Sequence, residues 1–256
     1  MLKMCYINSE IRGDIVVALI TGGARNIGRS IVLEFAKNGY DVVINYNNSE
    51  KEAIELKNYI EKTYKVNSLV IKCDISNEEE VKQMINEIIS KYSKIDVLIN
   101  NAAIELNSEF EEKTKETFDR VLDTNLVGTF LVSKYASFYM DKGYIINISS
   151  NNAINKNDPN TLEYDASKAG IISLTHNLAK KLSPNINVNC IAPGWVETNE
   201  IKELNKSLDN KFIEEESKKI LKGRFAKEEE IASLTYYLTT NNYINDTVIT
   251  IDGGSI

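Results

Sequence analysis

Residues 16–28 read VVALITGGARNIG, a continuous apolar run followed directly by a loop that carries three glycines. The run predicts a strand buried on both faces, and residues 27–37 continue as an amphipathic helix. In a strand–loop–helix unit of this kind, backbone N–H groups at the start of the helix bind a phosphate group. We therefore expect a dinucleotide-binding loop with contacts from Gly22, Arg25, Asn26, Ile27 and Gly28. Asn26 stands where such loops usually have a glycine, and asparagine tolerates the positive φ of that turn.

The same alternation of strand and helix runs through the rest of the chain. Six further apolar runs predict strands at residues 42–44, 69–73, 97–99, 144–148, 188–192 and 248–251. They are uninterrupted rather than alternating, which is typical of strands buried on both faces of a parallel sheet. The pattern predicts an α/β protein with a single-domain Rossmann fold, in which a doubly wound, seven-stranded parallel sheet carries helices on both faces.

The chain divides into a short tail and one domain. Its 256 residues include three prolines and no low-complexity linker. We expect an N-terminal tail at residues 1–14 and a single domain at residues 15–256. Residues 197–222 are polar, helical in pattern, and interrupt the alternation before the last strand. This insertion is a candidate lid over a substrate, and the alternative is a solvated helical hairpin.

Composition and charge exclude several classes of partner. Hydrophobic residues make up 43% of the chain, charged residues 26%, and the formal net charge is −7. A negative protein repels nucleic acid and anionic lipids, so we expect neither a nucleic-acid nor a membrane partner. No apolar stretch is as long as a membrane span and the opening residues do not form a secretory signal, so a cytoplasmic protein is expected. Cysteine, histidine and acidic residues form no cluster with metal-ligand spacing, so no metal site is expected.

Tyr164 and Lys168 stand four residues apart, with Ser149 and Ser150 upstream. Four residues are about one helical turn, so the phenol and the ammonium share one face. A cation one turn away favours the phenolate and lowers the tyrosine pKa, which makes the phenol a usable general acid or base. Only one of the two serines can face the same cleft, because successive residues at a strand end point to opposite faces. Alone, such a tyrosine–lysine pair is usually an exposed contact on a helix.

The segment after the second predicted strand bears on which nicotinamide cofactor would bind. Sites for NAD(H) typically place a carboxylate there for the ribose hydroxyls. This chain has Asn45, Tyr46 and Asn47 instead. No carboxylate would repel a 2′-phosphate, and Arg25 could pair with one. NADP(H) is therefore the expected cofactor, with NAD(H) the less favoured alternative.

Further motifs extend this pattern over nearly the whole chain. They are TGGARNIG at residues 21–28, CDI at 73–75, NNAA at 100–103, Asn125, Ser150, YDASK at 164–168, PGWVET at 193–198 and DGG at 252–254. In order and spacing they resemble the short-chain dehydrogenase/reductase superfamily. The chain departs from the family's pattern at Asn26 and Ala103, where a glycine is usual.

The resemblance implies a role for each matching residue. Tyr164 is the expected acid/base, Lys168 the residue that holds the nicotinamide ribose, and Ser150 the hydroxyl that polarises the substrate carbonyl. Asn125, within a helix expected over about residues 117–139, is the expected anchor of a proton-relay water. The implied cofactor contacts also include Asp74, Ile75, Asn101, Ala102, Pro193, Gly194, Val196 and Thr198.

Within this superfamily the chain resembles 3-oxoacyl-[acyl-carrier-protein] reductases. That resemblance implies an acyl-thioester substrate and an acidic acyl carrier protein as partner, for which Lys142, Lys180 and Lys181 are candidate contacts. A dehydrogenase of a sugar, polyol or other small alcohol is the enzymatic alternative, since residues 43–46 and 99–102 also resemble glucose dehydrogenases. A non-catalytic dinucleotide sensor is the third hypothesis. The family also implies a homotetramer, or a homodimer, formed through the helices near residues 117–139 and 164–182.

Overall fold

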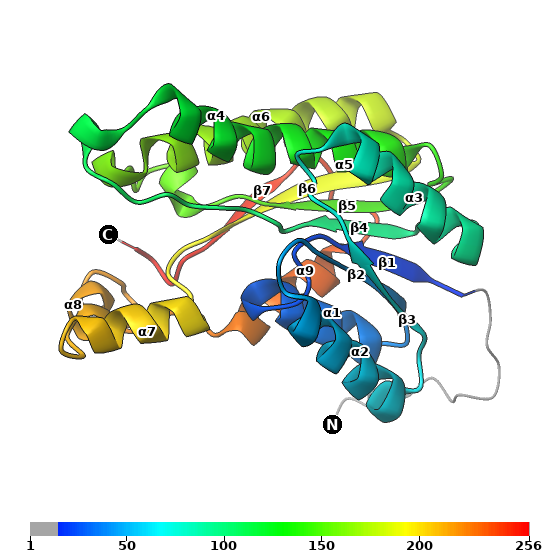
Figure 1. The fold of residues 1–256 in the computed structure, drawn as a ribbon, viewed down its shortest axis with the longest axis horizontal. Coiled ribbons are helices and arrows are strands. Elements are labelled where there is room, and N and C mark those ends of the chain that lie inside the picture. Colours follow the sequence, from blue (N-terminus) through cyan, green and yellow to red (C-terminus); the bar gives the residue numbers. More distant parts are fainter. Residues whose placement is uncertain (1–14, 256) are drawn as a thin grey trace.

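The computed structural model describes residues 15–255, so the predicted tail at residues 1–14 lies outside the described residues. Its centre is a sheet of seven parallel strands in the order β3-β2-β1-β4-β5-β6-β7 (Figure 1). The strands are β1 (Val17–Ile20), β2 (Asp41–Tyr46), β3 (Ser68–Lys72), β4 (Val97–Asn100), β5 (Gly143–Ile148), β6 (Ile186–Pro193) and β7 (Val248–Ile251). The predicted fold class is confirmed, and each predicted apolar run overlaps one strand.

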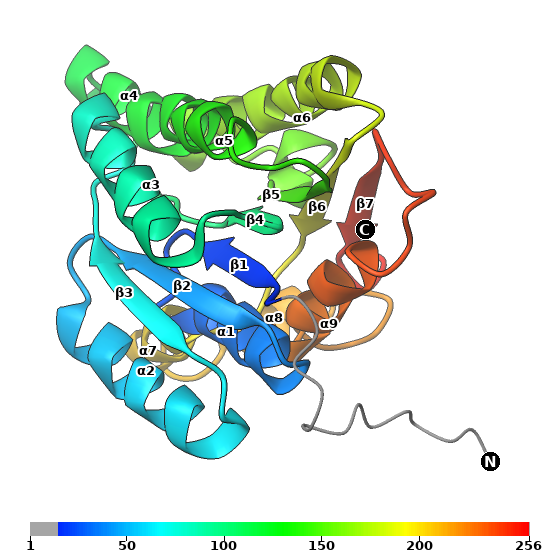
Figure 2. The ribbon, with the colours of Figure 1, turned by 90° about the vertical axis from the view of Figure 1, so that its right-hand side faces the viewer.

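Helices cover both faces of the sheet, because alternate residues of each strand are buried on opposite sides (Figure 2). Ala18 and Ile20 pack in one hydrophobic cluster with α1 (Asn26–Lys37), α2 (Glu50–Tyr64) and α9 (Glu228–Leu238). Val17 and Leu19 pack in a second cluster with α3 (Glu78–Tyr92), α5 (Thr129–Ser137) and α6 (Leu162–Leu182). The chain winds outward in both directions from the neighbouring strands β1 and β4. Their carboxyl ends therefore form the switch point where such sheets bind ligands.

The helix expected over residues 117–139 is interrupted. Helix α4 (Lys115–Leu122) passes into a π-helical turn at Asp123–Gly128 and then into α5. Gly128 packs so closely on Ile75 that a Cβ there would lie 3.0 Å from the Ile75 carbonyl oxygen. A π-helical turn within an α-helix is rare and often lies at a functional position. This one contains Asn125.

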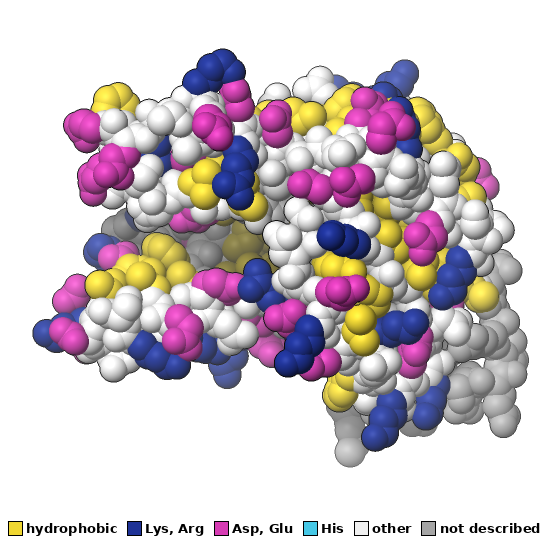
Figure 3. Space-filling view, viewed as in Figure 1, with side chains coloured by type: hydrophobic (Ala, Val, Ile, Leu, Met, Phe, Trp, Pro, Cys, Tyr) yellow, Lys and Arg dark blue, Asp and Glu magenta, His cyan; other side chains and the backbone are white. Residues whose placement is uncertain are grey.

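The insertion expected at residues 197–222 forms two short helices, α7 (Asn199–Ser207) and α8 (Phe212–Ser217), which project beyond the carboxyl ends of the strands (Figure 1). The Trp195 ring, just before the insertion, packs against one ring within it and one just after it. It stacks on Phe225 with 5.5 Å between ring centroids and contacts Phe212 of α8 edge-on at 5.4 Å. Figure 3 shows a deep notch between the insertion and the helices above it, with hydrophobic side chains on the insertion's inner side. The insertion therefore borders a cleft, and its closure over a substrate stays a prediction.

Residues 15–255 contain no group of three or more histidine, cysteine, aspartate or glutamate side chains placed to hold a metal ion. None of the helices in that range is both long and apolar enough to cross a membrane. Cys73 and Cys190 are free thiols, and both are buried.

Candidate active site

The glycine loop joins β1 to α1 at the carboxyl edge of the sheet. Gly22 has a φ of +61° and Asn26 one of +47°, so Asn26 adopts the left-handed conformation expected for it. A Cβ on Gly28 would lie 2.2 Å from the Gly22 carbonyl oxygen, so a larger residue cannot fit there without displacing the loop. Arg25 precedes α1 and does not cap it with its side chain. The first N–H groups of α1 therefore lack a side-chain cap and suit an anionic ligand.

Asn45 supports this loop from below. It is buried, its Oδ1 accepts a hydrogen bond from the Gly22 N–H at 3.2 Å, and its Nδ2 donates to the Cys73 carbonyl at 3.0 Å. Both ends of its amide are therefore paired within the protein, and the cofactor contact expected for Asn45 stays a prediction. Tyr46 is also largely buried, with its hydroxyl donating to Glu50 at 3.2 Å, whereas Asn47 is exposed.

The ends of β4 and β3 supply further parts of the same edge. Asn101 donates from Nδ2 to the Thr21 carbonyl at 3.0 Å, and the Ala102 N–H donates to the Thr21 hydroxyl at 3.1 Å. These bonds tie the predicted ribose-binding segment directly to the glycine loop. Beyond β3, Asp74 accepts hydrogen bonds on Oδ1 from the N–H and the hydroxyl of Ser76, at 3.0 and 2.7 Å. The carboxylate is thus held in one orientation, next to the buried Ile75 side chain.

Residues 193–198 form the wall expected to face the nicotinamide. Strand β6 ends at Pro193, and a Cβ on Gly194 would lie 2.7 Å from the Cβ of Asp252. Val196 is buried and pairs with Ala226 in a parallel bridge. Thr198 is the N-cap of α7, because its hydroxyl accepts a hydrogen bond from the Ile201 N–H at 3.3 Å. The wall therefore leads straight into the insertion.

Tyr164 and Lys168 lie on the first two turns of α6. The Lys168 Nζ is 5.4 Å from the centroid of the Tyr164 ring and donates a hydrogen bond to the Ile148 carbonyl at 2.8 Å. The side chain of Ser150 acts on the phenol of Tyr164 and lowers its pKa, whereas the Ser149 hydroxyl donates to the Lys168 carbonyl at 2.8 Å. Of the two serines, Ser150 is therefore the one beside the tyrosine, as expected.

The pKa of Tyr164 is raised rather than lowered. Burial is the main cause and the carboxylate of Glu105 adds to it, while the hydrogen bond with Ser150 lowers the pKa. Burial also lowers the pKa of Lys168 to about 8. The net direction is therefore opposite to the lowering that the sequence predicts. The cost of burying a phenolate exceeds the attraction of a cation that is itself buried and bonded to a backbone carbonyl.

Asn125 ties the loop after β4 to α6. Its side chain is buried, accepts a hydrogen bond from the Ile104 N–H at 2.8 Å, and donates to the Ile104 carbonyl at 2.9 Å and the Ser167 hydroxyl at 3.0 Å. These bonds place Asn125 between the loop and the helix that carries Tyr164. The expected anchoring of a relay water at Asn125 stays a prediction.

One charged residue beside Tyr164 was missed by the sequence reasoning. Glu105 lies in the loop after β4 and acts through its charge on both Tyr164 and Lys168. Loss of contact with water raises the pKa of Glu105 most, and the negative charges of Asp165 and Asp158 raise it further. An acid five residues after the central strand β4, at the switch point of the sheet, was the signal that could have identified it.

The lysines expected to contact an acidic carrier protein lie away from the cleft. Lys142 directly precedes β5, at the amino edge of the sheet. Lys180 and Lys181 lie at the end of α6, about 24 Å along the helix axis from Tyr164. This expectation is corrected, because α6 carries its two ends to opposite edges of the sheet.

Comparison with known proteins assigns the family. A family model described as Enoyl-(Acyl carrier protein) reductase matches residues 22–255. The 3-oxoacyl-[acyl-carrier-protein] reductase FabG of Staphylococcus aureus is 35% identical over 243 residues, covering 93% of this chain and 96% of that protein. A short-chain dehydrogenase/reductase from Serratia marcescens superposes with a TM-score of 0.87 at 31% identity, covering 93% and 97% of the two chains. The aldohexose dehydrogenase of Thermoplasma acidophilum does so with a TM-score of 0.83 at 28% identity, covering 94% and 93%. The chain therefore belongs to the short-chain dehydrogenase/reductase family of nicotinamide-dependent oxidoreductases.

Proposed function

We propose that this protein is an NADP(H)-dependent oxidoreductase that interconverts a carbonyl and a secondary alcohol, with 3-oxoacyl thioesters as its substrates. The observation that carries the proposal is the convergence of Ser150, Tyr164 and Lys168 at the sheet edge that also bears the glycine loop. The similarity to 3-oxoacyl-[acyl-carrier-protein] reductases supports the thioester. A non-catalytic sensor would need no serine and lysine placed beside a tyrosine in this way, so the sensor hypothesis is disfavoured.

The residues at the switch point fit a nicotinamide dinucleotide. The uncapped start of α1 suits the pyrophosphate, and the glycines at positions 22 and 28 leave room for its approach. Asp74 and Ile75 would lie on the adenine side, and residues 193–198 on the nicotinamide side. Lys168 would hold the nicotinamide ribose. When bound, the dinucleotide supplies or accepts the hydride.

The side chains of this chain would handle the proton and the developing charge. During reduction, Tyr164 donates its phenolic proton to the carbonyl oxygen of the substrate, and in oxidation it takes the proton back. Its raised pKa keeps the proton on the phenol at neutral pH, which suits the donor role. Ser150 donates a hydrogen bond to the same oxygen as negative charge develops there. The Lys168 ammonium stabilises the phenolate left after the transfer.

Arg25 supports NADP(H) over NAD(H). Its guanidinium lies at the start of α1 with half of the side chain exposed, and no acid follows β2 before Glu50. An arginine–phosphate bond is charge-assisted, so Arg25→Ala should raise KM for NADPH by about tenfold or more and leave KM for NADH nearly unchanged. Equal changes for the two cofactors would reject this part of the proposal.

A second candidate function is favoured by Glu105. Its carboxylate lies close enough to Tyr164 to raise the pKa of the phenol, and a carboxylate there would accept hydrogen bonds from hydroxyl groups next to the reacting carbon. A sugar or polyol offers such hydroxyls, whereas the alkyl side of a 3-oxoacyl chain does not. The structural similarity to an aldohexose dehydrogenase supports this alternative.

Assembly and location belong to the same proposal. We expect a homotetramer, or a homodimer, in the cytoplasm. Phe130 and Phe138, in and just after α5, keep 42% and 67% of their surface exposed. Neighbouring exposed aromatic side chains on one helix mark a contact surface. A monomer in light scattering would refute the assembly.

One assay separates these functions. NADPH absorbance is followed with acetoacetyl-CoA and with acetoacetyl-acyl carrier protein, and NADP⁺ reduction is followed with glucose. The main proposal expects turnover of the thioesters, and turnover of glucose alone would favour the second candidate. Tyr164→Phe should lower kcat by about 10²- to 10⁴-fold while leaving the Kd for NADPH unchanged. Near wild-type kcat in this variant would defeat the mechanism.

A further inference from the structure

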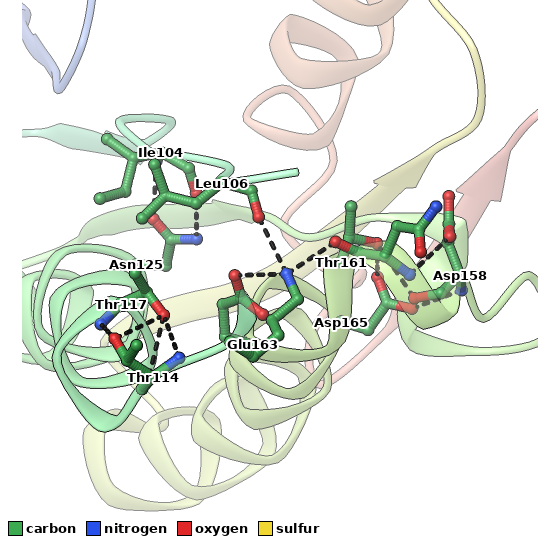
Figure 4. A network of polar contacts seen from close by, with 11 residues as sticks. Ile104, Leu106, Thr114, Thr117, Asn125, Asp158, Thr161, Glu163 and Asp165 are labelled. Atoms are coloured by element: carbon green, nitrogen blue, oxygen red, sulfur yellow. Dashed lines mark hydrogen bonds and ion pairs between the residues drawn. The ribbon is translucent and has the colours of Figure 1, made fainter. Parts of the chain in front are cut away.

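A buried ion pair lies directly beside the proposed acid/base. The Lys113 Nζ donates three hydrogen bonds, to Glu163 Oε1 at 2.8 Å, the Asn160 carbonyl at 2.7 Å and the Leu106 carbonyl at 3.1 Å (Figure 4). The two side chains are only 8% and 0% exposed. Every other ion pair within residues 15–255 has both side chains at least 23% exposed. Among the ion pairs of these residues, the Lys113–Glu163 pair is therefore the buried one.

The pair joins the loop after β4 to the start of α6. Glu163 immediately precedes Tyr164, and Leu106 lies in the middle of that loop. Asn125 holds the same loop two residues earlier, through both backbone groups of Ile104. Glu105 thus lies between two anchored backbone positions, so its carboxylate has a defined place relative to Tyr164.

The residue on the other side of Tyr164 anchors the opposite wall. Asp165 binds the segment that follows Ser150, with partners at 2.9 Å (Asn152 Nδ2), 2.9 Å (Asp158 N–H) and 3.1 Å (Thr161 hydroxyl). Tyr164 is therefore flanked in sequence by Glu163 and Asp165, whose bonds tie α6 to the loop after β4 and to the segment after Ser150 (Figure 4).

Stability alone is a weak reason for the Lys113–Glu163 pair. Taking two charges out of water costs several kcal/mol per ion, and apolar residues of similar volume often serve stability equally well or better. Glu163 Oε2 is buried without a hydrogen-bond partner, so the carboxylate is not fully compensated. What the pair does supply is three directional bonds that converge on one ammonium, which fixes geometry rather than merely filling space.

We propose that Lys113 and Glu163 are positioning residues for the reaction: together they lock the loop at residues 104–113 onto the helix that carries Tyr164. The inference rests on the proposed function for its kinetic consequences. The charged groups that act on the Tyr164 phenol are Glu105 from this loop and Asp165 from α6, and the Lys168 ammonium of α6 lies 5.4 Å from the centroid of the Tyr164 ring. Releasing the loop moves Glu105 relative to the phenol and leaves the two groups on α6 in place.

The experiment uses the double variant Lys113→Met/Glu163→Leu, which replaces both charges and leaves neither one buried alone. We expect a Tm equal to or above that of the wild type, an unchanged Kd for NADPH, and a kcat lowered by about tenfold or more through misplacement of the substrate wall. The pH midpoint of alcohol oxidation should also move to lower pH as Glu105 withdraws. Lys115→Met is the matched control, because Lys115 pairs with Asp119 on the surface two residues further along.

Amide hydrogen exchange on the ligand-free protein keeps the test independent of the substrate. Residues 104–113 should exchange faster in the double variant than in the wild type, with residues 21–28 unchanged. Wild-type exchange, kcat and pH profile in the double variant would overturn the inference. If the wild type is inactive but residues 104–113 still exchange faster in the double variant, the proposed function is rejected and the structural role of the ion pair is kept. If the double variant does not fold, Glu163→Gln tests the same exchange prediction, because it keeps the shape but weakens the bond to Lys113.

Discussion

The ammonium of Lys168 lies 5.4 Å from the centroid of the Tyr164 ring, yet its hydrogen bond goes to the Ile148 carbonyl at 2.8 Å. The two groups are neighbours on α6 without a direct ion–phenol bond. Burial lowers the pKa of the lysine and so opposes its charged form, whereas it raises the pKa of the tyrosine and so favours the neutral phenol. This relationship makes the site sensitive to pH and costly for stability.

The first prediction concerns the stability cost of Lys168. Its pKa falls from 10.5 to about 8 on folding, so between these pH values the unfolded chain binds more protons than the folded one. The destabilising contribution is therefore complete below pH 8 and fades as pH rises toward 10.5. Lys168→Met should raise the free energy of unfolding at pH 7 by about 2 kcal/mol, after allowing for the lost hydrogen bond. Urea unfolding of the two ligand-free proteins measures this difference in free energy of unfolding.

The same prediction is checked by measuring how the difference in free energy of unfolding between Lys168→Met and the wild type changes with pH. The advantage of Lys168→Met over the wild type should shrink between pH 8 and pH 10, and the variant should be inactive at both. An advantage that grows with pH, or a variant less stable than the wild type at pH 7, would contradict the argument.

The second prediction concerns Glu105 and the pH profile. Oxidation of an alcohol requires the deprotonated phenol, so its rate rises with pH through the pKa of Tyr164. The Glu105 carboxylate raises that pKa. Glu105→Gln removes the charge and should shift the rise in oxidation rate to lower pH, and it should shift the loss of carbonyl reduction the same way. Steady-state kcat/KM measured from pH 7 to beyond pH 10, where the raised pKa of Tyr164 places the midpoints, gives the shift.

Glu109→Gln is the matched control for Glu105→Gln, since Glu109 is an exposed acid on the same loop. Its midpoint should equal that of the wild type. A shift to higher pH in Glu105→Gln would show that the carboxylate acts on Tyr164 in the opposite sense.

The third prediction concerns a contact between the insertion and the glycine loop. Glu200, in the first turn of α7, pairs with Arg25 at 3.5 Å and also accepts a hydrogen bond from the Asn26 side chain. The carboxylate would compete with a 2′-phosphate for the same guanidinium. Glu200→Gln should therefore lower the Kd for NADPH by about two- to fivefold, the size expected for an exposed pair, and leave the Kd for NADH unchanged.

Fluorescence titration of both cofactors checks this third prediction. Glu203→Gln serves as the control, because Glu203 lies on the same helix and pairs with Lys206 instead. Weaker NADPH binding in Glu200→Gln would mean that Glu200 supports the cofactor site rather than competing with it.

The fourth prediction compares two positions of the glycine loop. Gly28→Ala puts a Cβ 2.2 Å from the Gly22 carbonyl oxygen, so the loop must move. We expect a loss of about 1–3 kcal/mol in stability and at least tenfold weaker cofactor binding. Asn26→Gly restores the glycine at a position that already has a positive φ. It should change stability by no more than about 1 kcal/mol and keep cofactor binding. Thermal unfolding and NADPH titration test both variants, and a Gly28→Ala protein that binds normally would refute the role of close packing.

Much of the fold could be predicted from the sequence because a parallel sheet imposes a local signature. Each strand is buried on both faces, so each appears as an uninterrupted apolar run, as residues 16–20 do before the glycine loop. The tyrosine–lysine pair could also be predicted from local spacing, since Tyr164 and Lys168 lie on one face of any helix that contains them. The π-helical turn at Asp123–Gly128 was not predicted, because it changes the hydrogen-bond spacing without altering the types of residue.

The sequence by itself determined the order of strands and helices, the glycine loop and the spacing of Tyr164 and Lys168, because these depend on neighbours along the chain. Only the tertiary structure decided which polar groups face the cleft and which are hydrogen-bonded inside the protein. Asn45 and Asn125 are consumed by backbone groups 21 or more residues away. Lys113 finds Glu163 across 50 residues, and Glu105 acts on Tyr164 from another loop. The physical reason is that burial and pairing, which set the charge and the position of a side chain, are properties of the packed chain and not of its local order.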